Sequence, residues 1–333
     1  MCTAAVYQTK NTYFGRNLDL EFSYGESIAI LPHNYPLNFR HTSPLTHHHA
    51  IIGVAYITPD STGQDYPLLY DAINDQGLGM AGLNFVGNAI LHDPVNDPSH
   101  PVDNITQFEF LPWILGQCST VAEARKLLAH INLCNTPFNT NLPPSELHWI
   151  IADVKDCIVV EAIADGLHVY DNPVKVLTNN PPFPEQLFAL NNYRHLSPTV
   201  LDNTFLPSVD LNIYSRGMGS LGLPGDLTSQ SRFIRASFTR AHSISPDDPE
   251  SSISQFFHIL HSVDQTRGLC ELGDNKYEIT VYSSGYNLNA GVCYYTAYDN
   301  HQITAVDMHR VDLEGSTLVK FPMLTTEQIN YQN

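Results

Sequence analysis

The sequence predicts an α+β fold in which antiparallel sheets are covered by helices. The 333 residues, 43% of them hydrophobic, are enough to bury a large core. Strand and helix patterns arrive in blocks rather than as alternating strand–helix units, an order that is typical of antiparallel α+β domains. No repeat or shift in composition divides the chain, so we expect a single domain over residues 1–333.

The first block of strands occupies about the first 85 residues. Runs rich in β-branched and aromatic residues, separated by turn residues, predict strands at 3–8, 13–20, 27–31, 50–57 and 78–85. Gly77, Gly79 and Gly82, near the start of this last run, have the spacing of a dinucleotide-binding motif, but the residues after them make a poor helix start. We interpret these glycines as a tight turn or as a close backbone approach within a strand.

Helical patterning begins near Gln107. A helix is predicted over residues 120–131, because Thr120 and Glu123 form a capping box and apolar residues then share one face. The remaining elements keep the same block order. We expect strands at 147–153, 157–163, 167–170 and 175–177, helices at 232–242 and 252–263, and strands at 277–282, 291–297 and 302–307. An irregular excursion runs from about residue 181 to 218.

Charge and composition exclude several classes of function. The formal net charge is −18 with 16 Lys and Arg, which argues against binding to nucleic acid or to anionic membrane surfaces. No apolar run approaches the ~18 residues of a membrane span, and the start lacks the features of a signal peptide, so we expect a cytoplasmic protein. The six cysteines form no C-x-x-C pair, and we expect neither disulfides nor a metal site.

Cys2 follows the initiator Met1 directly. Removal of Met1 would leave a cysteine with a free α-amine, whose pKa of about 8 suits a base at neutral pH. One residue would then supply both a nucleophile and a base. Arg16 and Asp19 come after the first turn of an expected hairpin that returns beside Cys2. A guanidinium favours a thiolate, and a carboxylate can orient an amine.

Five segments together resemble one known family. They are short, rich in polar residues and glycine, and occur in the order Met1-Cys2-Thr3, Phe14-Gly15-Arg16-Asn17-Leu18-Asp19, Gly79-Met80-Ala81-Gly82-Leu83-Asn84-Phe85, Leu177-Thr178-Asn179-Asn180-Pro181 and Gly222-Leu223-Pro224-Gly225-Asp226-Leu227-Thr228-Ser229-Gln230-Ser231-Arg232-Phe233. On these segments the chain resembles the choloylglycine hydrolase family, which comprises bile salt hydrolases and penicillin V acylases. The resemblance covers nearly the whole chain. Asn180 departs from it, since members commonly have Ser there.

The resemblance implies the fold of N-terminal-nucleophile hydrolases, a four-layer αββα sandwich of two antiparallel sheets between helical layers. It also implies amide hydrolysis without a metal or cofactor. In this family pattern Cys2 is the nucleophile and its own amine the base. Arg16 and Asp19 would position and tune this pair, and Arg232 would brace the site.

Two asparagines match the family's oxyanion donors, which are typically worth about 3 kcal/mol each. Asn179 would donate through its side-chain amide and Asn84 through its backbone amide. Asn84 also favours conjugated bile salts as substrates, because related penicillin V acylases often have Tyr there. A penicillin V acylase or other acyl-amide hydrolase is the alternative, and a non-catalytic ligand-binding protein is a remote one. We expect the steroid cavity to be lined by four apolar side chains, Leu18, Ile57, Phe85 and Phe138.

Arg216 lies just before the glycine-rich segment that begins at Gly222. In the resembling family this loop is associated with amino-acid preference, and a Ser-Arg start is similar to the taurine-preferring type. We therefore expect Arg216 to bind the substrate and to favour taurine conjugates over glycine conjugates. The resemblance also implies that the excursion over about 181–218 locks subunits together in a homotetramer.

Overall fold

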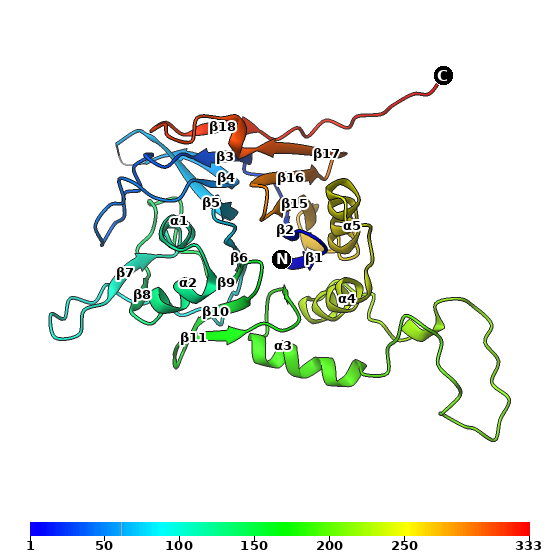
Figure 1. The fold of residues 1–333 in the computed structure, drawn as a ribbon. Coiled ribbons are helices and arrows are strands. Elements are labelled where there is room, and N and C mark those ends of the chain that lie inside the picture. The colour runs from blue at the N-terminus through cyan, green and yellow to red at the C-terminus, as the bar shows by residue number, and fades with distance from the viewer. Residues whose placement is uncertain (61) are drawn as a thin grey trace.

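Two antiparallel sheets lie face to face at the centre of the computed structural model, which describes residues 1–60 and 62–333 (Figure 1). The six-stranded sheet has the order β12-β1-β2-β15-β16-β17. Its strands are β1 (Cys2–Gln8), β2 (Thr12–Leu20), β12 (Val176–Leu177), β15 (Ile279–Asn287), β16 (Val292–Ala297) and β17 (Asn300–Asp307). The N-terminus therefore lies in a central position, on a strand with neighbours on both sides.

The eight-stranded sheet has the order β11-β10-β9-β6-β5-β4-β3-β18. Its strands are β3 (Ser27–Leu31), β4 (Ile51–Pro59), β5 (Asp65–Asn74), β6 (Gly79–Asn84), β9 (Leu147–Ala152), β10 (Cys157–Ile163), β11 (Gly166–Asp171) and β18 (Val319–Pro322). Two small pairs lie outside the large sheets. They are β7 (Asp103–Thr106) with β8 (Ile131–Cys134), which is parallel, and β13 (Glu271–Gly273) with β14 (Lys276–Tyr277), which is antiparallel.

Helices cover the outer face of each sheet (Figure 1). The helices α1 (Phe110–Gln117) and α2 (Val121–Leu128) pack on the eight-stranded sheet, and α4 (Ser229–His242) and α5 (Pro249–His261) pack on the six-stranded sheet. The shorter helices are α3 (Phe183–Ala189), η1 (Leu190–Tyr193), η2 (Met218–Ser220) and η3 (Met308–Arg310). The four-layer α+β sandwich that the sequence predicts is confirmed.

Alternation along the strands explains the layers. Ile52 and Val54 of β4 pack toward the six-stranded sheet, while Ile51 and Ala55 pack toward α1 and α2. Because successive side chains of a strand point to opposite faces, a strand that is apolar at every position is covered on both sides. All four side chains are fully buried. This pattern places β4 in an inner layer of the sandwich.

The predicted helix over residues 120–131 begins where expected but ends early. Thr120 is the N-cap and its side chain accepts a hydrogen bond from the backbone N–H of Glu123. The helix ends at Leu128, because Ile131 starts β8 and pairs in parallel with Asp103. A partner strand distant in sequence thus overrides the helical pattern at this end. The strand β5 and the helix α3 were not predicted.

Gly79, one of the glycines with dinucleotide-motif spacing, lies where there is no room for a side chain. A Cβ atom at this position would lie 2.8 Å from the ring of Phe14 on the opposing sheet. The two sheets therefore approach closely at β6, and a side chain at Gly79 would push them apart. This confirms the interpretation of a close backbone approach within a strand.

The segment between α3 and α4 extends away from the body of the fold (Figure 1). It carries exposed large apolar side chains, including Phe205 at 89% and Tyr214 at 79% exposure. Within the described residues, no helix has the length and apolar character needed to cross a membrane.

Candidate active site

The register of the β1–β2 hairpin determines which side chains surround Cys2. Cys2 lies opposite Leu18, and Ala4 lies opposite Arg16. Opposite residues on antiparallel strands share a face, and so do alternate residues, so Cys2, Leu18 and Arg16 point to one side of the sheet. Asp19 directly follows Leu18 on β2, so its side chain points to the other side of the sheet. The hairpin therefore places a cation and a carboxylate on different sides of the strand that begins with Cys2.

The Arg16 guanidinium connects Cys2 to the eight-stranded sheet. Its Nη2 lies 2.5 Å from the Cys2 sulfur, and its Nη1 donates to the carbonyl oxygen of Gly82 at 2.5 Å. Burial lowers the pKa of this guanidinium, but the negative charge available on Cys2, followed by that on neighbouring acidic groups, outweighs burial and raises the pKa. Arg16 therefore stays cationic beside the sulfur, which favours a thiolate.

A buried carboxylate lies behind Arg16. Asp71 accepts hydrogen bonds from Tyr282 at 2.5 Å, Ser284 at 2.6 Å and Tyr286 at 2.7 Å, and its Oδ1 lies 4.0 Å from Nε of Arg16. Burial raises the pKa of Asp71, and the Arg16 charge and the hydroxyl donors offset this only in part. This network could not be predicted from the sequence, because its members lie on β5 and β15 and share no local pattern.

Arg232 projects from α4 onto the start of β1. Its Nη1 donates to the carbonyl oxygen of Cys2 at 2.5 Å and to Oγ1 of Thr3 at 2.6 Å, while its Nη2 donates to Oδ1 of Asn179 at 2.7 Å. It also lies 3.9 Å from Oδ2 of Asp19. Arg232 therefore fixes both the backbone of Cys2 and the orientation of the Asn179 amide.

Asn179 and Asn84 approach each other from the two sheets. Oδ1 of Asn179 accepts from the Cys2 nitrogen at 2.8 Å, and its Nδ2 donates to the Asn84 carbonyl oxygen at 2.8 Å. The N–H and C=O of one strand residue point to the same side, so the Asn84 N–H also faces Asn179. Asn179 therefore links the Cys2 nitrogen to the end of β6.

Asp19 lies close to Met1 and Thr280. Its Oδ1 accepts from Oγ1 of Thr280 at 2.7 Å, whereas its buried Oδ2 has no hydrogen-bond partner among the described residues. Burial raises the pKa of Asp19, although Arg232 and the N-terminal ammonium oppose the shift. The Met1 ammonium donates to the Asp19 carbonyl oxygen at 2.6 Å and pairs with Glu278. Removal of Met1 would turn the Cys2 nitrogen into a free amine.

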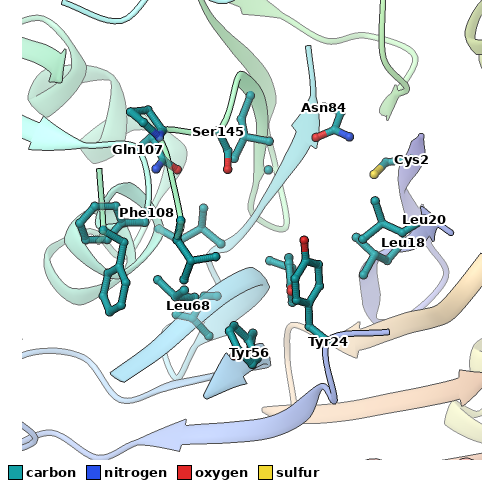
Figure 2. A pocket seen from close by; sticks show the side chains of 18 of the residues that line it. Cys2, Leu18, Leu20, Tyr24, Tyr56, Leu68, Asn84, Gln107, Phe108 and Ser145 are labelled. Atoms are coloured by element: carbon teal, nitrogen blue, oxygen red, sulfur yellow. The ribbon is translucent and has the colours of Figure 1, made fainter. Parts of the chain in front are cut away.

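A cavity of about 380 Å³ opens beside Cys2. Figure 2 shows Cys2 and Asn84 on one side of it and Leu68 and Phe108 on the other. Its lining is largely apolar and includes Leu18, Leu20, Leu68, Phe108, Phe138 and Leu142. A cavity of this size and character suits a rigid apolar ligand with a reactive group at one end.

Of the four apolar side chains expected in this cavity, Leu18 and Phe138 line it. Phe85 does not, because it is fully buried in the fold with its ring stacked on His148 at a centroid distance of 4.3 Å. Ile57 packs instead against the core cluster beneath α1 and α2. Arg216 is exposed on the excursion and is not among the described residues that line the cavity.

Asp264 is a third carboxyl group near the site whose pKa is raised. Its Oδ1 accepts from Nδ2 of Asn17 at 3.0 Å. Burial raises the pKa of Asp264 to about 7, and the negative charge of Asp19 adds to the shift. Because the folded-state pKa exceeds the ordinary value of 3.8, the stability linked to this group is fully present below about pH 4 and is lost as the pH rises through 7.

The Asp264→Asn substitution is therefore expected to stabilise the protein at alkaline pH. The amide keeps an oxygen that can accept from Asn17 but carries no charge to bury. At pH 8 we expect a gain of roughly 2–4 kcal/mol in the free energy of unfolding, and at pH 4 a gain near zero. Urea unfolding at the two pH values measures the difference, and an equal effect at both would contradict this account of Asp264.

Comparisons with known proteins agree along the whole chain. The family described as "Linear amide C-N hydrolases, choloylglycine hydrolase family" matches residues 2–321. The "Bile salt hydrolase/transferase" of Lactiplantibacillus plantarum is 52% identical, with 98% of each chain covered. The protein of the same name from Clostridium perfringens is 36% identical, with 100% of each chain covered.

Solved structures share the fold. The crystal structure of the C2A mutant of the conjugated bile acid hydrolase from Clostridium perfringens matches with a TM-score of 0.90 and 35% identity over 100% of both chains. Penicillin V acylase from Agrobacterium tumefaciens matches with a TM-score of 0.71 and 19% identity over 96% of this chain and 91% of that one. This match shows a shared fold. The chain belongs to the choloylglycine hydrolase family and is a hydrolase of linear amide C–N bonds.

Proposed function

We propose that this protein hydrolyses the amide bond of conjugated bile acids through the Cys2 thiol, after removal of Met1. The observation that carries the proposal is the apolar cavity that ends at the Cys2 sulfur and Arg16. A conjugated bile acid offers a rigid apolar steroid for the cavity and an amide at the end of its side chain. The bile salt hydrolases from two organisms that match the full chain support this substrate class.

In the first proposed step, the α-amine of Cys2 accepts the thiol proton and the sulfur attacks the amide carbonyl carbon. Arg16 stabilises the thiolate from 2.5 Å. The carbonyl oxygen becomes an oxyanion as the sulfur–carbon bond forms. The backbone N–H of Asn84 and the Nδ2 hydrogens of Asn179 bind this charge.

Collapse of the tetrahedral intermediate breaks the carbon–nitrogen bond. The ammonium of Cys2 gives its proton to the leaving nitrogen, so the amino acid departs as a neutral amine and the acyl group remains on sulfur as a thioester. Water then attacks the thioester while the amine again accepts a proton. The bile acid leaves and the Cys2 thiol is restored, so one residue carries every proton transfer.

The substrate class is tested by comparing three substrates with protein whose Met1 removal has been checked by mass. Release of taurine from taurocholate and of glycine from glycocholate is measured beside cleavage of penicillin V. We expect kcat/KM to be higher for the bile salts. The opposite order would assign the site to penicillin V or another acyl amide, and no turnover by folded, processed protein would favour the non-catalytic binding protein.

We also propose that the enzyme prefers taurine conjugates and that Arg216 supplies the preference. Its guanidinium can bind a sulfonate through several charge-assisted hydrogen bonds. Arg216 is exposed on the excursion, outside the residues that line the cavity of its own chain. The preference therefore depends on the excursion of a neighbouring subunit reaching the site.

This dependence fits a further proposal, that the excursion assembles subunits into a homotetramer. Its exposed apolar side chains, such as Phe205, Ile213 and Tyr214, are typical of a surface that a partner covers. Light scattering should then give about four times the chain mass of 37.2 kDa. A monomeric mass would contradict the assembly and, with it, the role given to Arg216.

The Arg216→Ala substitution is expected to lower kcat/KM for taurocholate about tenfold and for glycocholate by less, because a charge-assisted contact is worth about 1.5 kcal/mol or more. Arg194→Ala is the matched control, since Arg194 is also exposed on the excursion. Steady-state kinetics on both conjugates measure the ratio. Equal losses of kcat/KM on the two conjugates would show that Arg216 is not the source of a taurine preference.

A further inference from the structure

A buried histidine–glutamate pair lies behind the candidate oxyanion site. His148 projects from β9 and Glu161 from β10, and both side chains are 0% exposed. Nδ1 of His148 lies 2.9 Å from Oε1 of Glu161, and Nε2 lies 2.8 Å from the carbonyl oxygen of Thr178. Neither residue is among the described residues that line the cavity. The pair therefore cannot touch the substrate, and the proposed steps of hydrolysis leave it without a role.

Hydrogen-bond partners determine where the protons of this pair lie. The Thr178 carbonyl can only accept, so Nε2 of His148 carries a hydrogen. The Glu161 carboxylate also accepts from the backbone N–H of Phe183 at the start of α3, at 3.0 and 3.2 Å. Nδ1 of His148 is within hydrogen-bonding distance of Oε1 of Glu161. Both ring nitrogens are thus engaged, and the imidazole cannot rotate without losing two bonds.

The hydrogen bond from Nε2 of His148 to Thr178 holds the peptide group between Thr178 and Asn179. The carbonyl of that peptide belongs to Thr178 and accepts from His148, while its N–H belongs to Asn179 and donates to Oγ of Ser229 at 2.8 Å. The peptide plane is therefore held from both edges. Because the Asn179 side chain starts from this plane, its Nδ2 is directed by the same contacts.

The imidazole ring also contacts the strand that carries the other donor. Phe85 comes directly after Asn84 and stacks on His148 at a centroid distance of 4.3 Å and an interplanar angle of 5°. Leu83 precedes Asn84 and is the cross-strand partner of His148. The residues on both sides of Asn84 therefore rest against His148.

We propose that His148, held by Glu161, is a positioning residue that sets the distance between the two oxyanion donors, Asn179 and Asn84. One side chain touches the peptide before one donor and the residues flanking the other, although the donors come from different sheets. The inference rests on the proposed function of the site, because it assumes that these two groups bind the oxyanion. In this proposal His148 and Glu161 affect the reaction through the two donors, without touching the substrate.

Two substitutions separate the contacts of His148. In His148→Gln the amide nitrogen takes the place of Nε2 and still reaches the Thr178 carbonyl. In His148→Asn it takes the place of Nδ1, reaches Glu161 and leaves the Thr178 carbonyl without its donor. His168→Asn is the control, because His168 on β11 also pairs with a carboxylate, Asp165, and stacks on an aromatic ring but is partly exposed.

We expect His148→Asn to lower kcat by about 10- to 100-fold with KM within about threefold, less than the ~10²- to 10³-fold cost of losing an oxyanion donor outright. His148→Gln should retain clearly more of kcat, and His168→Asn should match the wild type. Thermal unfolding checks that each variant is folded at the assay temperature. A purely structural role would predict lower stability with an unchanged kcat for the folded fraction, and that result would overturn the proposal, as would equal kcat losses in the Gln and Asn variants.

Alkylation of Cys2 by iodoacetamide distinguishes failure of this inference from failure of the proposed function. Displacement at the iodoacetamide methylene carbon creates no oxyanion, so its rate reports the thiolate and not the donors. We expect the same alkylation rate in His148→Asn as in the wild type. A rate that falls together with kcat would show general damage at Cys2 and refute the positioning role. If the wild type cleaves penicillin V instead of bile salts, the same comparison applies with that substrate.

Discussion

The Cys2→Ala substitution is expected to lower hydrolysis of conjugated bile acids by about 10⁴-fold or more, since it removes the thiol that we propose forms the covalent intermediate. The side chain is buried at 2% exposure at the start of β1, so the smaller residue should leave the fold intact. Cys2→Ser keeps an oxygen nucleophile and should retain a low residual activity. Taurine release under single-turnover conditions measures both.

Another cysteine provides the control for this loss. Cys134 is also buried, and burial raises the pKa of its thiol to about 11, so it stays protonated and unreactive at neutral pH. Cys134→Ala should therefore keep kcat within about twofold, with only a modest loss of stability. Turnover by folded Cys2→Ala at a rate near that of the wild type would exclude Cys2 as the nucleophile.

The Asn179→Ala substitution is expected to lower kcat by about 10²- to 10³-fold, the usual cost of losing one oxyanion donor, which is the role that we propose for Asn179. Its Nδ2 donates beside Cys2, and its Oδ1 holds both the Cys2 nitrogen and Arg232, so the loss should be larger than a surface change would give. KM should change far less, because in the proposed mechanism the amide binds charge that appears mainly in the transition state.

Asn180→Ala is the matched control for this donor. Asn180 is adjacent and exposed, and its Nδ2 donates outward to the carbonyl oxygen of Val86 at 2.8 Å. We expect kcat within about threefold of the wild type. If instead Asn180→Ala is the more damaging of the two substitutions, the neighbouring residue is the donor and the assignment of Asn179 is wrong.

Local signals in the sequence were sufficient for much of the fold. Thr120 caps its helix as predicted, because capping depends on the few residues that come after it. The β1–β2 hairpin is also local, and its register alone brings Arg16 to the same face as Cys2. The block order of strands and helices predicted the layers, since it reflects which elements can neighbour one another.

Contacts between distant elements could not be read from the sequence. Asp71 and Tyr282 meet across the two sheets, and His148 reaches Thr178 in the same way. Ile57 and Phe85 carried the same apolar signal as Leu18. Ile57, however, packs against the core cluster beneath α1 and α2, and Phe85 is buried against His148. Apolar character predicts burial, and only the packing of the sheets decides between core and cavity.

Turnover by the two N-terminal forms of the chain tests the central claim most directly. Expression with and without inhibition of methionine aminopeptidase gives chains that keep or lack Met1, which intact-mass measurement distinguishes. With Met1 in place the Cys2 nitrogen is an amide bound to Asn179 and cannot serve as a base. We predict that taurocholate hydrolysis resides in the processed chain alone. Equal hydrolysis by the chain that keeps Met1 would contradict a mechanism in which the Cys2 amine moves the proton.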